Sequence, residues 1–307
     1  MKIRTLAIGV IAFGLAIQSN IDLQAQTTKA QIDGQSFVAD FYATKGAKKT
    51  VVLFLSGSEG GRPHSSLPQM FAQNGYSVLA IAYFKEIGLP ETLQMVPLEY
   101  FDGPLEWIRQ NHKESRIVLV GASKGAELAL LLASRKPDIN GVIALSPSSV
   151  VWDGLPKSFW PPDPKSSWSA GGEPVPFVPY NYSKAFAPGD PRAIYKFYEQ
   201  SLTQKEAVKK ATIPVEKIAG PVLLASGAED QLWPAREMGE AICDRLKQKG
   251  FKYRFEHVVY QEAGHTFNEY FPMGGTKEGN RKARLDLADQ MLRFLQRVDS
   301  TALHSDR

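Results

Sequence analysis

Four short runs of apolar residues set the strongest limit on the fold of this chain. The runs VVLFL (51–55), VLAIA (78–82), IVLV (117–120) and VIAL (142–145) contain no polar residue. Strands of this kind belong to parallel sheets whose two faces are both covered by helices. Segments of helical period separate the runs, so the sequence predicts an α/β protein with a mostly parallel, doubly wound sheet.

Further segments extend this alternation at both ends. Before the first helical segment, SFVADFYAT (36–44) and TVVLFLSG (50–57) are joined by a short polar stretch and are expected to form a hairpin. The later segments are two expected strands and two expected helices: GPVLLASG (220–227), PAREMGEAICDRLKQKG (234–250), YRFEHVVY (253–260) and RKARLDLADQMLRFLQR (281–297).

The N-terminal segment has the layout of a signal peptide. Lys2 and Arg4 precede an apolar run from Thr5 to Ile17, and small and polar residues follow up to Ala25. The run is shorter than the roughly 20 residues that cross a bilayer, and no later segment approaches that length. We expect residues 1–25 to be removed from a periplasmic or secreted protein without a stable membrane span; an uncleaved anchor is the alternative.

Residues 26–307 are expected to form one domain that carries a long insertion. The alternation of strands and helices stops over residues 151–213, which are rich in proline, glycine and aromatic residues. An insertion of this length is usually a lid or a binding surface, or is disordered, and its aromatic content argues against disorder. We expect a lid over the active site with Trp160 and Trp168 as apolar walls; a brace packed elsewhere is the alternative.

Charge and cysteine content exclude several functional classes. The net charge is only +4 and no run of five or six like charges occurs, so nucleic acid is not expected as a partner. The single cysteine, Cys243, cannot form an internal disulfide. The sequence shows neither a metal-ligand cluster nor a nucleotide fingerprint, and we therefore predict no cofactor and no metal.

A serine between two glycines stands where an apolar strand gives way to a helix. Gly121, Ser123 and Gly125 form the pattern G-x-S-x-G in VGASKGAELALLLA. In α/β-hydrolases this pattern is the nucleophile elbow, a strained turn that exposes the serine hydroxyl at the sheet edge. A helix cap is the plain alternative. The setting favours Ser123 as a nucleophile.

A serine nucleophile needs a histidine base and a carboxylate that orients it. Asp230 follows the expected strand at 220–227, and His265 follows the next strand, so the chain order Ser, Asp, His is that of α/β-hydrolases. Glu229 is the alternative acid. Backbone N–H groups of Lys124 and Ser58 are expected to form the oxyanion hole, with Glu59 as the alternative to Ser58.

Longer stretches carry a more specific resemblance. LFLSGSEGG, LAIAYFKEIGLPETLQMVPLEYFDGPLEWI, VGASKGAELALLLAS and YQEAGHTF resemble the C-terminal domain of the acyl-CoA thioesterase and bile acid-CoA:amino acid N-acyltransferase family, which is similar to dienelactone hydrolases. The resemblance implies the α/β-hydrolase fold and assigns the triad to Ser123, Asp230 and His265. It implies acyl-CoA esters as substrates; these are intracellular, whereas export favours other esters.

The sequence features suggest three alternative functions. The first is an exported serine hydrolase that acts on a small-molecule carboxylic ester or thioester through an acyl-enzyme on Ser123. The second is an acyltransferase that passes the same acyl group to an amine or alcohol. The third is a non-catalytic binding module, which would be expected to have a broken triad. The intact Ser, Asp and His positions favour the first.

Overall fold

The structure of the chain is a computed structural model that describes residues 27–32, 36–157, 163–181 and 189–300. The leader predicted at residues 1–25 lies outside the described residues. The strands of the large sheet are β1 (Thr27–Ile32), β2 (Val38–Thr44), β3 (Thr50–Leu55), β4 (Ser77–Ala82), β6 (Arg116–Ala122), β7 (Gly141–Leu145), β10 (Val222–Gly227) and β11 (Phe255–Tyr260).

The sheet has the order β1-β2-β4-β3-β6-β7-β10-β11. The six strands from β4 to β11 are parallel, and β2 and β1 continue the sheet in antiparallel pairing. The predicted hairpin of β2 and β3 is wrong, because β4 lies between them. Strand β3 is buried on both faces and pairs with parallel strands on both sides, which leaves β2 beside β4.

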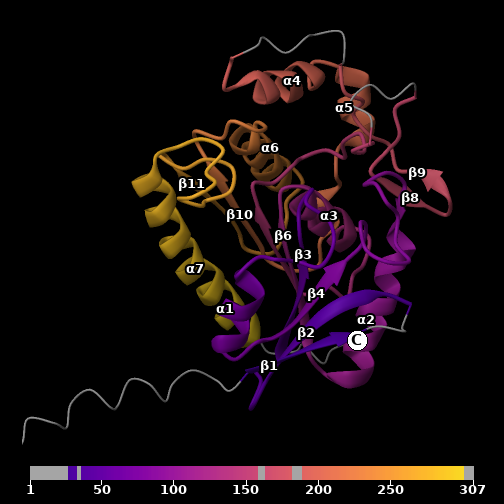
Figure 1. The fold of residues 1–307 in the computed structure, drawn as a ribbon, viewed down its shortest axis with the longest axis vertical. Coiled ribbons are helices and arrows are strands. Elements are labelled where there is room, and N and C mark those ends of the chain that lie inside the picture. Colours follow the sequence, from indigo (N-terminus) through magenta and orange to yellow (C-terminus); the bar gives the residue numbers. More distant parts are fainter. Residues whose placement is uncertain (1–26, 33–35, 158–162, 182–188, 301–307) are drawn as a thin grey trace, which may run out of the picture.

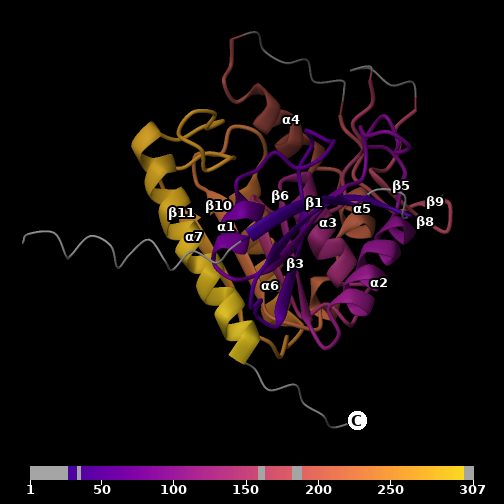
Figure 2. The ribbon, with the colours of Figure 1, turned by 60° about the horizontal axis from the view of Figure 1, so that its bottom comes forward.

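Helices cover both faces of the sheet (Figures 1 and 2). The residues of β3 alternate between the two cores: Val51, Leu53 and Leu55 pack with one, Val52 and Phe54 with the other. This alternation explains the wholly apolar runs of the sequence, since each face of the strand needs its own apolar cover. The helices of the first core are α2 (Asp102–Asn111), α3 (Lys124–Ala133) and α6 (Ala235–Gln248); those of the second are α1 (Leu67–Gln73) and α7 (Lys277–Ser300).

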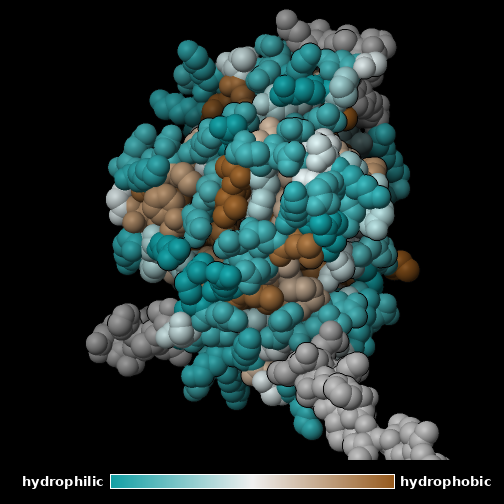
Figure 3. All heavy atoms as spheres, turned by 90° about the vertical axis from the view of Figure 1, so that its left-hand side faces the viewer, coloured by the Kyte–Doolittle hydropathy of each residue, from teal (hydrophilic) through white to brown (hydrophobic). Residues whose placement is uncertain are grey.

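The surface on the α7 side is mostly hydrophilic, with apolar side chains gathered in small separate patches (Figure 3). Helix α7 turns Leu287, Met291, Phe294 and Leu295 toward the sheet, as an amphipathic surface helix does. Within the described part of the chain, no helix is both long enough and apolar enough to cross a membrane.

The insertion at residues 151–213 folds onto the domain as two layers. Its inner layer contains Trp152 and Asp153, which form bridges with Val178 and Ser166. It also contains β8 (Trp168–Ala170) and β9 (Glu173–Pro174), which form a small sheet with β5 (Val96–Pro97). Its outer layer contains α4 (Ala193–Ser201) and α5 (Lys205–Ala211), which lie at the top of the molecule in Figure 1. Two short 3-10 helices, η1 (Leu98–Phe101) and η2 (Val215–Lys217), complete the described elements.

The order of the strands reverses its direction between β3 and β6. From β3 the chain moves to β4 on one side, and from β6 it continues to β7 on the other. Open α/β sheets bind their ligands at such a reversal, outside the carboxyl ends of the strands. We therefore expect the ligand to bind beside the residues that directly follow β3 and β6.

Candidate active site

Ser123 occupies a strained turn between β6 and α3. Its backbone has φ of 55° and ψ of −120°, a combination that side chains with a Cβ rarely adopt. Strain of this kind costs about 1–3 kcal/mol and persists only where the surroundings enforce it. Here the N–H of Ser123 donates to the carbonyl of Leu145 at the end of β7 (2.9 Å), which helps to hold the turn.

The two glycines of the motif allow helix and strands to approach closely. A Cβ on Gly121 would lie 2.1 Å from the carbonyl oxygen of Gly125, and a Cβ on Gly125 would lie 2.2 Å from that of Leu55. Both contacts are with backbone, which cannot yield as a flexible side chain does. Any larger residue would push the start of α3 away from β3 and β6.

Asp230 and His265 form a buried hydrogen-bonded pair. His265 Nδ1 lies 2.7 Å from Asp230 Oδ2, and the two side chains are only 5% and 3% exposed. The other carboxylate oxygen of Asp230 accepts the backbone N–H groups of Leu232 (2.7 Å) and Trp233 (3.1 Å). These donors fix the carboxylate so that it can orient the imidazole. Glu229, the alternative acid, is exposed and has no contact with the imidazole among those described.

The end of β7 ties the serine to the histidine. Leu145 accepts the N–H of Ser123, and the hydroxyl of the next residue, Ser146, donates to the carbonyl of His265 (2.6 Å). Two consecutive residues therefore hold the turn of Ser123 and the loop of His265. Sequence reasoning did not single out Ser146, because a serine after a strand carries no signal of its own.

The two atoms that would exchange a proton are both available. In the described part of the chain, neither Ser123 Oγ nor the buried His265 Nε2 has a hydrogen-bond partner. Buried polar atoms are almost always paired, so an orphaned nitrogen calls for an explanation. An imidazole whose Nδ1 faces a carboxylate and whose Nε2 is free is arranged as a general base.

The two expected oxyanion donors follow β3 and β6, the strands on the two sides of the reversal in strand order. Lys124 begins α3 directly after Ser123, and Ser58 follows Gly57 in the loop after β3. A Cβ built on Gly57 would lie 3.4 Å from that of Ser123, so this loop runs beside the serine. Among the described residues, no acceptor pairs with the backbone N–H of Lys124 or of Ser58. The N–H of Glu59, the alternative, also has no acceptor there.

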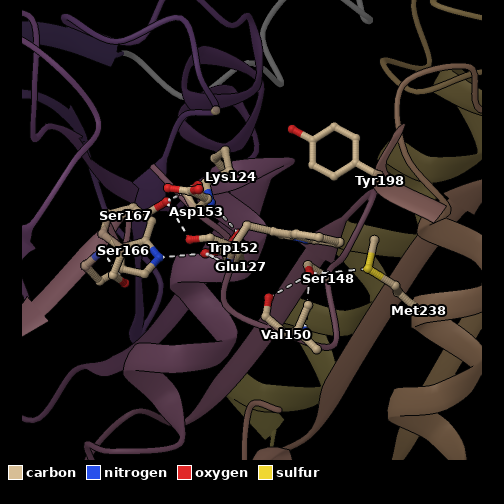
Figure 4. A network of polar contacts seen from close by, with 12 residues as sticks. Lys124, Glu127, Ser148, Val150, Trp152, Asp153, Ser166, Ser167, Tyr198 and Met238 are labelled. Atoms are coloured by element: carbon tan, nitrogen blue, oxygen red, sulfur yellow. Dashed lines mark hydrogen bonds and ion pairs between the residues drawn. The ribbon is translucent and has the colours of Figure 1, made fainter. Parts of the chain in front are cut away.

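The side chain of Lys124 is buried in an ion pair that sequence reasoning missed (Figure 4). Its Nζ lies 2.6 Å from Glu127 Oε2, and the two side chains are 2% and 0% exposed. Burial lowers the pKa of the Lys124 ammonium and raises the pKa of the Glu127 carboxyl, and their mutual attraction opposes both shifts. A glutamate in the otherwise apolar helix KGAELALLLA, three residues after a lysine, was the available signal.

Two aromatic residues of the insertion donate hydrogen bonds to the second carboxylate oxygen of Glu127. Its Oε1 accepts the indole N–H of Trp168 (2.7 Å) and the backbone N–H of Trp152 (3.2 Å). Trp168 is fully buried in the first core, which contains α3. It therefore packs as a brace rather than as an open wall of a lid. Trp160, the other expected wall, lies outside the described residues.

A chain of aromatic contacts connects the insertion to His265. The ring of Tyr198 on α4 lies 4.9 Å from that of Trp152 and 5.5 Å from that of Trp233, and the ring of Trp233 lies 5.6 Å from that of His265. The insertion therefore packs against Trp233 of the loop that carries Asp230, and Trp233 in turn lies against one side of the histidine.

Comparison with known proteins identifies the family. The family model described as "BAAT / Acyl-CoA thioester hydrolase C terminal" matches residues 96–283, more than half of the chain. The chain belongs to this family. The segment includes all three predicted triad residues, although Ser58 precedes it.

Individual members of the family cover most of the chain. Mouse acyl-coenzyme A thioesterase 6 is 28% identical over 284 residues, which are 83% of this chain and 62% of that protein. Human acyl-coenzyme A thioesterase 2, mitochondrial, is 25% identical over 248 residues, which are 74% of this chain and 48% of that protein. The chain thus spans about half to three fifths of the length of these relatives.

Solved structures show the α/β-hydrolase fold predicted from the sequence. A putative dienelactone hydrolase from Klebsiella pneumoniae aligns with 88% of this chain and 98% of its own, at a TM-score of 0.55 and 17% identity. An esterase from Pyrococcus furiosus aligns with 91% of this chain and 93% of its own, at a TM-score of 0.55 and 16% identity. At these identities the likeness concerns the fold.

Proposed function

We propose that the protein is a serine hydrolase that cleaves carboxylic esters or thioesters through an acyl-enzyme on Ser123. The observation that carries the proposal is the buried Asp230–His265 pair, whose free Nε2 lies at the same sheet edge as the strained serine. Membership of a family described by acyl-CoA thioester hydrolysis supports the same reaction.

In the first half-reaction Ser123 Oγ attacks the acyl carbonyl while His265 Nε2 takes the hydroxyl proton. Asp230 keeps Nδ1 of the imidazole protonated and stabilises the imidazolium that forms. The backbone N–H groups of Lys124 and Ser58 donate to the oxyanion of the tetrahedral intermediate. As the intermediate collapses, the imidazolium gives its proton to the departing alkoxide or thiolate, and the acyl group remains on the serine.

In the second half-reaction water takes the place of the leaving group. His265 removes a proton from the water, which attacks the acyl-serine, and the proton then returns to Ser123 Oγ as the carboxylic acid departs. If an amine or alcohol entered instead, the same site would act as an acyltransferase. The family description includes both branches, so products should be analysed with and without added acceptors.

The relatives support one substrate class. The names of the curated relatives specify acyl-coenzyme A thioesters, which makes these the first substrates to test. We also propose that residues 1–25 direct export, as their charge and hydropathy pattern indicates, and in that setting other esters are the alternative substrates.

The triad is tested with purified variants on a panel of acyl-CoA thioesters and nitrophenyl esters of increasing chain length. Ser123→Ala and His265→Ala should each lower kcat by about 10⁴-fold or more, with the thermal transition retained. A fluorophosphonate probe should label the parent protein and not Ser123→Ala.

The acid is tested by a matched pair of neighbouring substitutions. Asp230→Asn should lower kcat strongly because the amide favours the wrong imidazole tautomer, whereas Glu229→Gln should leave kcat within a factor of two. Parent-like turnover by Ser123→Ala would refute the mechanism, and a large loss in Glu229→Gln alone would reassign the acid.

A further inference from the structure

The two expected oxyanion donors belong to segments far apart in the sequence, and something must hold them at one separation. The N–H of Lys124 is fixed to α3, and that of Ser58 to the loop after β3. Donors act on an oxyanion only when both lie about 2.7–3.1 Å from it. The side chains that fix each segment therefore bear on the geometry of the oxyanion hole.

The segment of Lys124 is fixed through its own side chain. The ammonium group reaches Glu127 one turn further along α3, and Glu127 is held by the indole of Trp168 and the backbone of Trp152. Asp153 adds a further buried negative charge near the ammonium and accepts the backbone N–H groups of Lys165 and Tyr180. The first turn of α3 is thus joined to the inner layer of the insertion.

The segment of Ser58 is fixed by Tyr83, which directly follows β4. The Tyr83 hydroxyl donates to the carbonyl of Ser56 (2.5 Å) and also lies 3.3 Å from that of Gly57. These are the two residues before Ser58. Burial raises the pKa of Tyr83 well above its ordinary value, so the hydroxyl keeps its proton and remains a donor. The phenol therefore restrains the loop that presents the Ser58 N–H.

Trp168 contacts both the Lys124–Glu127 ion pair and Tyr83. Its ring centroid is 5.8 Å from that of Tyr83, the Lys124 ammonium lies 5.7 Å from its ring, and its N–H is bonded to Glu127. Trp168 and Glu127 are fully buried, and Tyr83 is nearly so. Close-packed interiors transmit strain, so a change in the side chain of one of these residues displaces the other two.

We propose that Glu127, Trp168 and Tyr83 are positioning residues that set the separation of the two oxyanion donors, and that the inner layer of the insertion is thereby part of the catalytic apparatus. The inference rests on the proposed function, since it concerns the oxyanion of that reaction. None of the three side chains touches the reacting atoms. Their effect is on kcat, because misplaced donors weaken binding of the transition state more than binding of the substrate.

The central experiment compares two tyrosine-to-phenylalanine substitutions. Tyr83→Phe removes the bond to the Ser56 carbonyl and keeps the ring. Tyr100→Phe removes a bond of 2.6 Å to the carbonyl of Ala82 on β4 and the acceptor of the Val38 N–H (3.0 Å), and it removes no described bond to the loop of Ser58. Both variants lose one hydroxyl bonded to a backbone carbonyl. Tyr83→Phe should lower kcat about tenfold with KM within twofold, and Tyr100→Phe should leave both within twofold.

A transition-state analogue separates positioning from general destabilisation. Ser123 Oγ adds to the carbonyl carbon of a trifluoromethyl ketone, and the serine hydroxyl proton passes to His265. The ketone oxygen becomes an oxyanion that needs both donors. Its inhibition constant should rise in Tyr83→Phe by the same factor by which kcat/KM falls, and should not change in Tyr100→Phe. A loss that is equal in the two variants, or absent from Tyr83→Phe, would overturn the proposal.

The charged part of the group is tested by a pair of substitutions at α3. Glu127→Gln keeps an acceptor for the Trp168 indole but removes the carboxylate that is ion-paired with the buried Lys124 ammonium, which is strongly unfavourable. The double variant Lys124→Met/Glu127→Gln removes both charges and should recover at least part of the kcat lost in Glu127→Gln. A double variant no better than Glu127→Gln, or a Glu127→Gln with parent-like kcat, would contradict the coupling.

The outcome for Ser123→Ala distinguishes failure of the proposed function from failure of the positioning proposal. If Ser123→Ala retains turnover, the proposed function itself fails. If Ser123→Ala is inactive while Tyr83→Phe and Glu127→Gln match the parent protein in kcat and in inhibition, the hydrolase proposal stands and the positioning proposal is wrong.

Discussion

Replacement of Gly125 by alanine tests how closely helix and sheet must approach at the active site. The added Cβ would lie 2.2 Å from the carbonyl oxygen of Leu55 and 2.3 Å from that of Ser56. Ordinary contacts of a Cβ begin near 3.4 Å. The start of α3 and the end of β3 must therefore separate by about 1 Å, which overpacking data suggest costs about 1–3 kcal/mol of folding stability.

The same displacement moves Lys124 and the loop of Ser58 apart. A shift of about 1 Å in a catalytic constellation can lower turnover by about 10²-fold, so the loss of kcat should greatly exceed what partial unfolding explains. Urea denaturation gives the stability, and kcat is measured at a temperature where the variant is fully folded. The proposal that close approach serves catalysis is refuted if folded Gly125→Ala keeps kcat within a factor of two.

A matched control lies at the other end of the sheet. A Cβ on Gly141, the first residue of β7, would meet the ring of Phe294 at 3.2 Å and the carbonyl of Pro221 at 3.5 Å. The ring can shift by a few tenths of an ångström, unlike backbone. Gly141→Ala should therefore change stability only slightly and leave kcat within a factor of two.

Two further predictions concern stability and processing. Arg245 holds the pKa of Glu216 below its ordinary value through bonds of 2.6 and 2.7 Å, so this pair stabilises the fold above about pH 4.5 and the stabilisation is lost as pH falls through the lowered pKa. Glu216→Gln should cost about 0.5–1 kcal/mol at pH 7 by urea denaturation, and this cost should shrink as the pH falls below about 4.5; a cost that does not change with pH would contradict this account. For the predicted export, N-terminal sequencing of protein from its native host should begin near Gln26, whereas intact protein beginning at Met1 in the cytosol would contradict cleavage.

The sheet was largely predictable because its signal is local. Strands β3, β4, β6 and β7 are buried on both faces, which leaves an unbroken apolar run in the sequence. Pairing is a different matter, since it depends on segments far apart. The sequence segments of β2 and β3 resemble a hairpin, but in the structure β4 lies between them and pairs with both. Strand β1 has four exposed residues and no apolar pattern, so it was missed.

The candidate site divides in the same way. Ser123, Asp230 and His265 each stand directly after or soon after a strand, and the fold class dictates their order, so sequence position was enough to nominate them. Glu127 and Tyr83 matter through partners 41 and 27 positions away, Trp168 and Ser56 respectively. No local pattern reveals such pairs. Burial of a charge in an apolar helix is the one hint that sequence offers, and it does not identify the partner.

The burial of Trp152 and Trp168 also determines which parts of this protein could be exchanged with a relative. The inner layer shares its apolar core with α3 and supplies two of the donors on Glu127, so a transplanted inner layer without those donors would leave a carboxylate buried and underbonded. Helices α4 and α5 form the outer layer and make no described hydrogen bond to Glu127. A chimera that grafts only the outer layer keeps the hydrogen bonds of Glu127 and should fold if the graft retains the ring of Tyr198, which packs against Trp152 and Trp233. The natural unit for an exchange is therefore smaller than the insertion visible in the sequence.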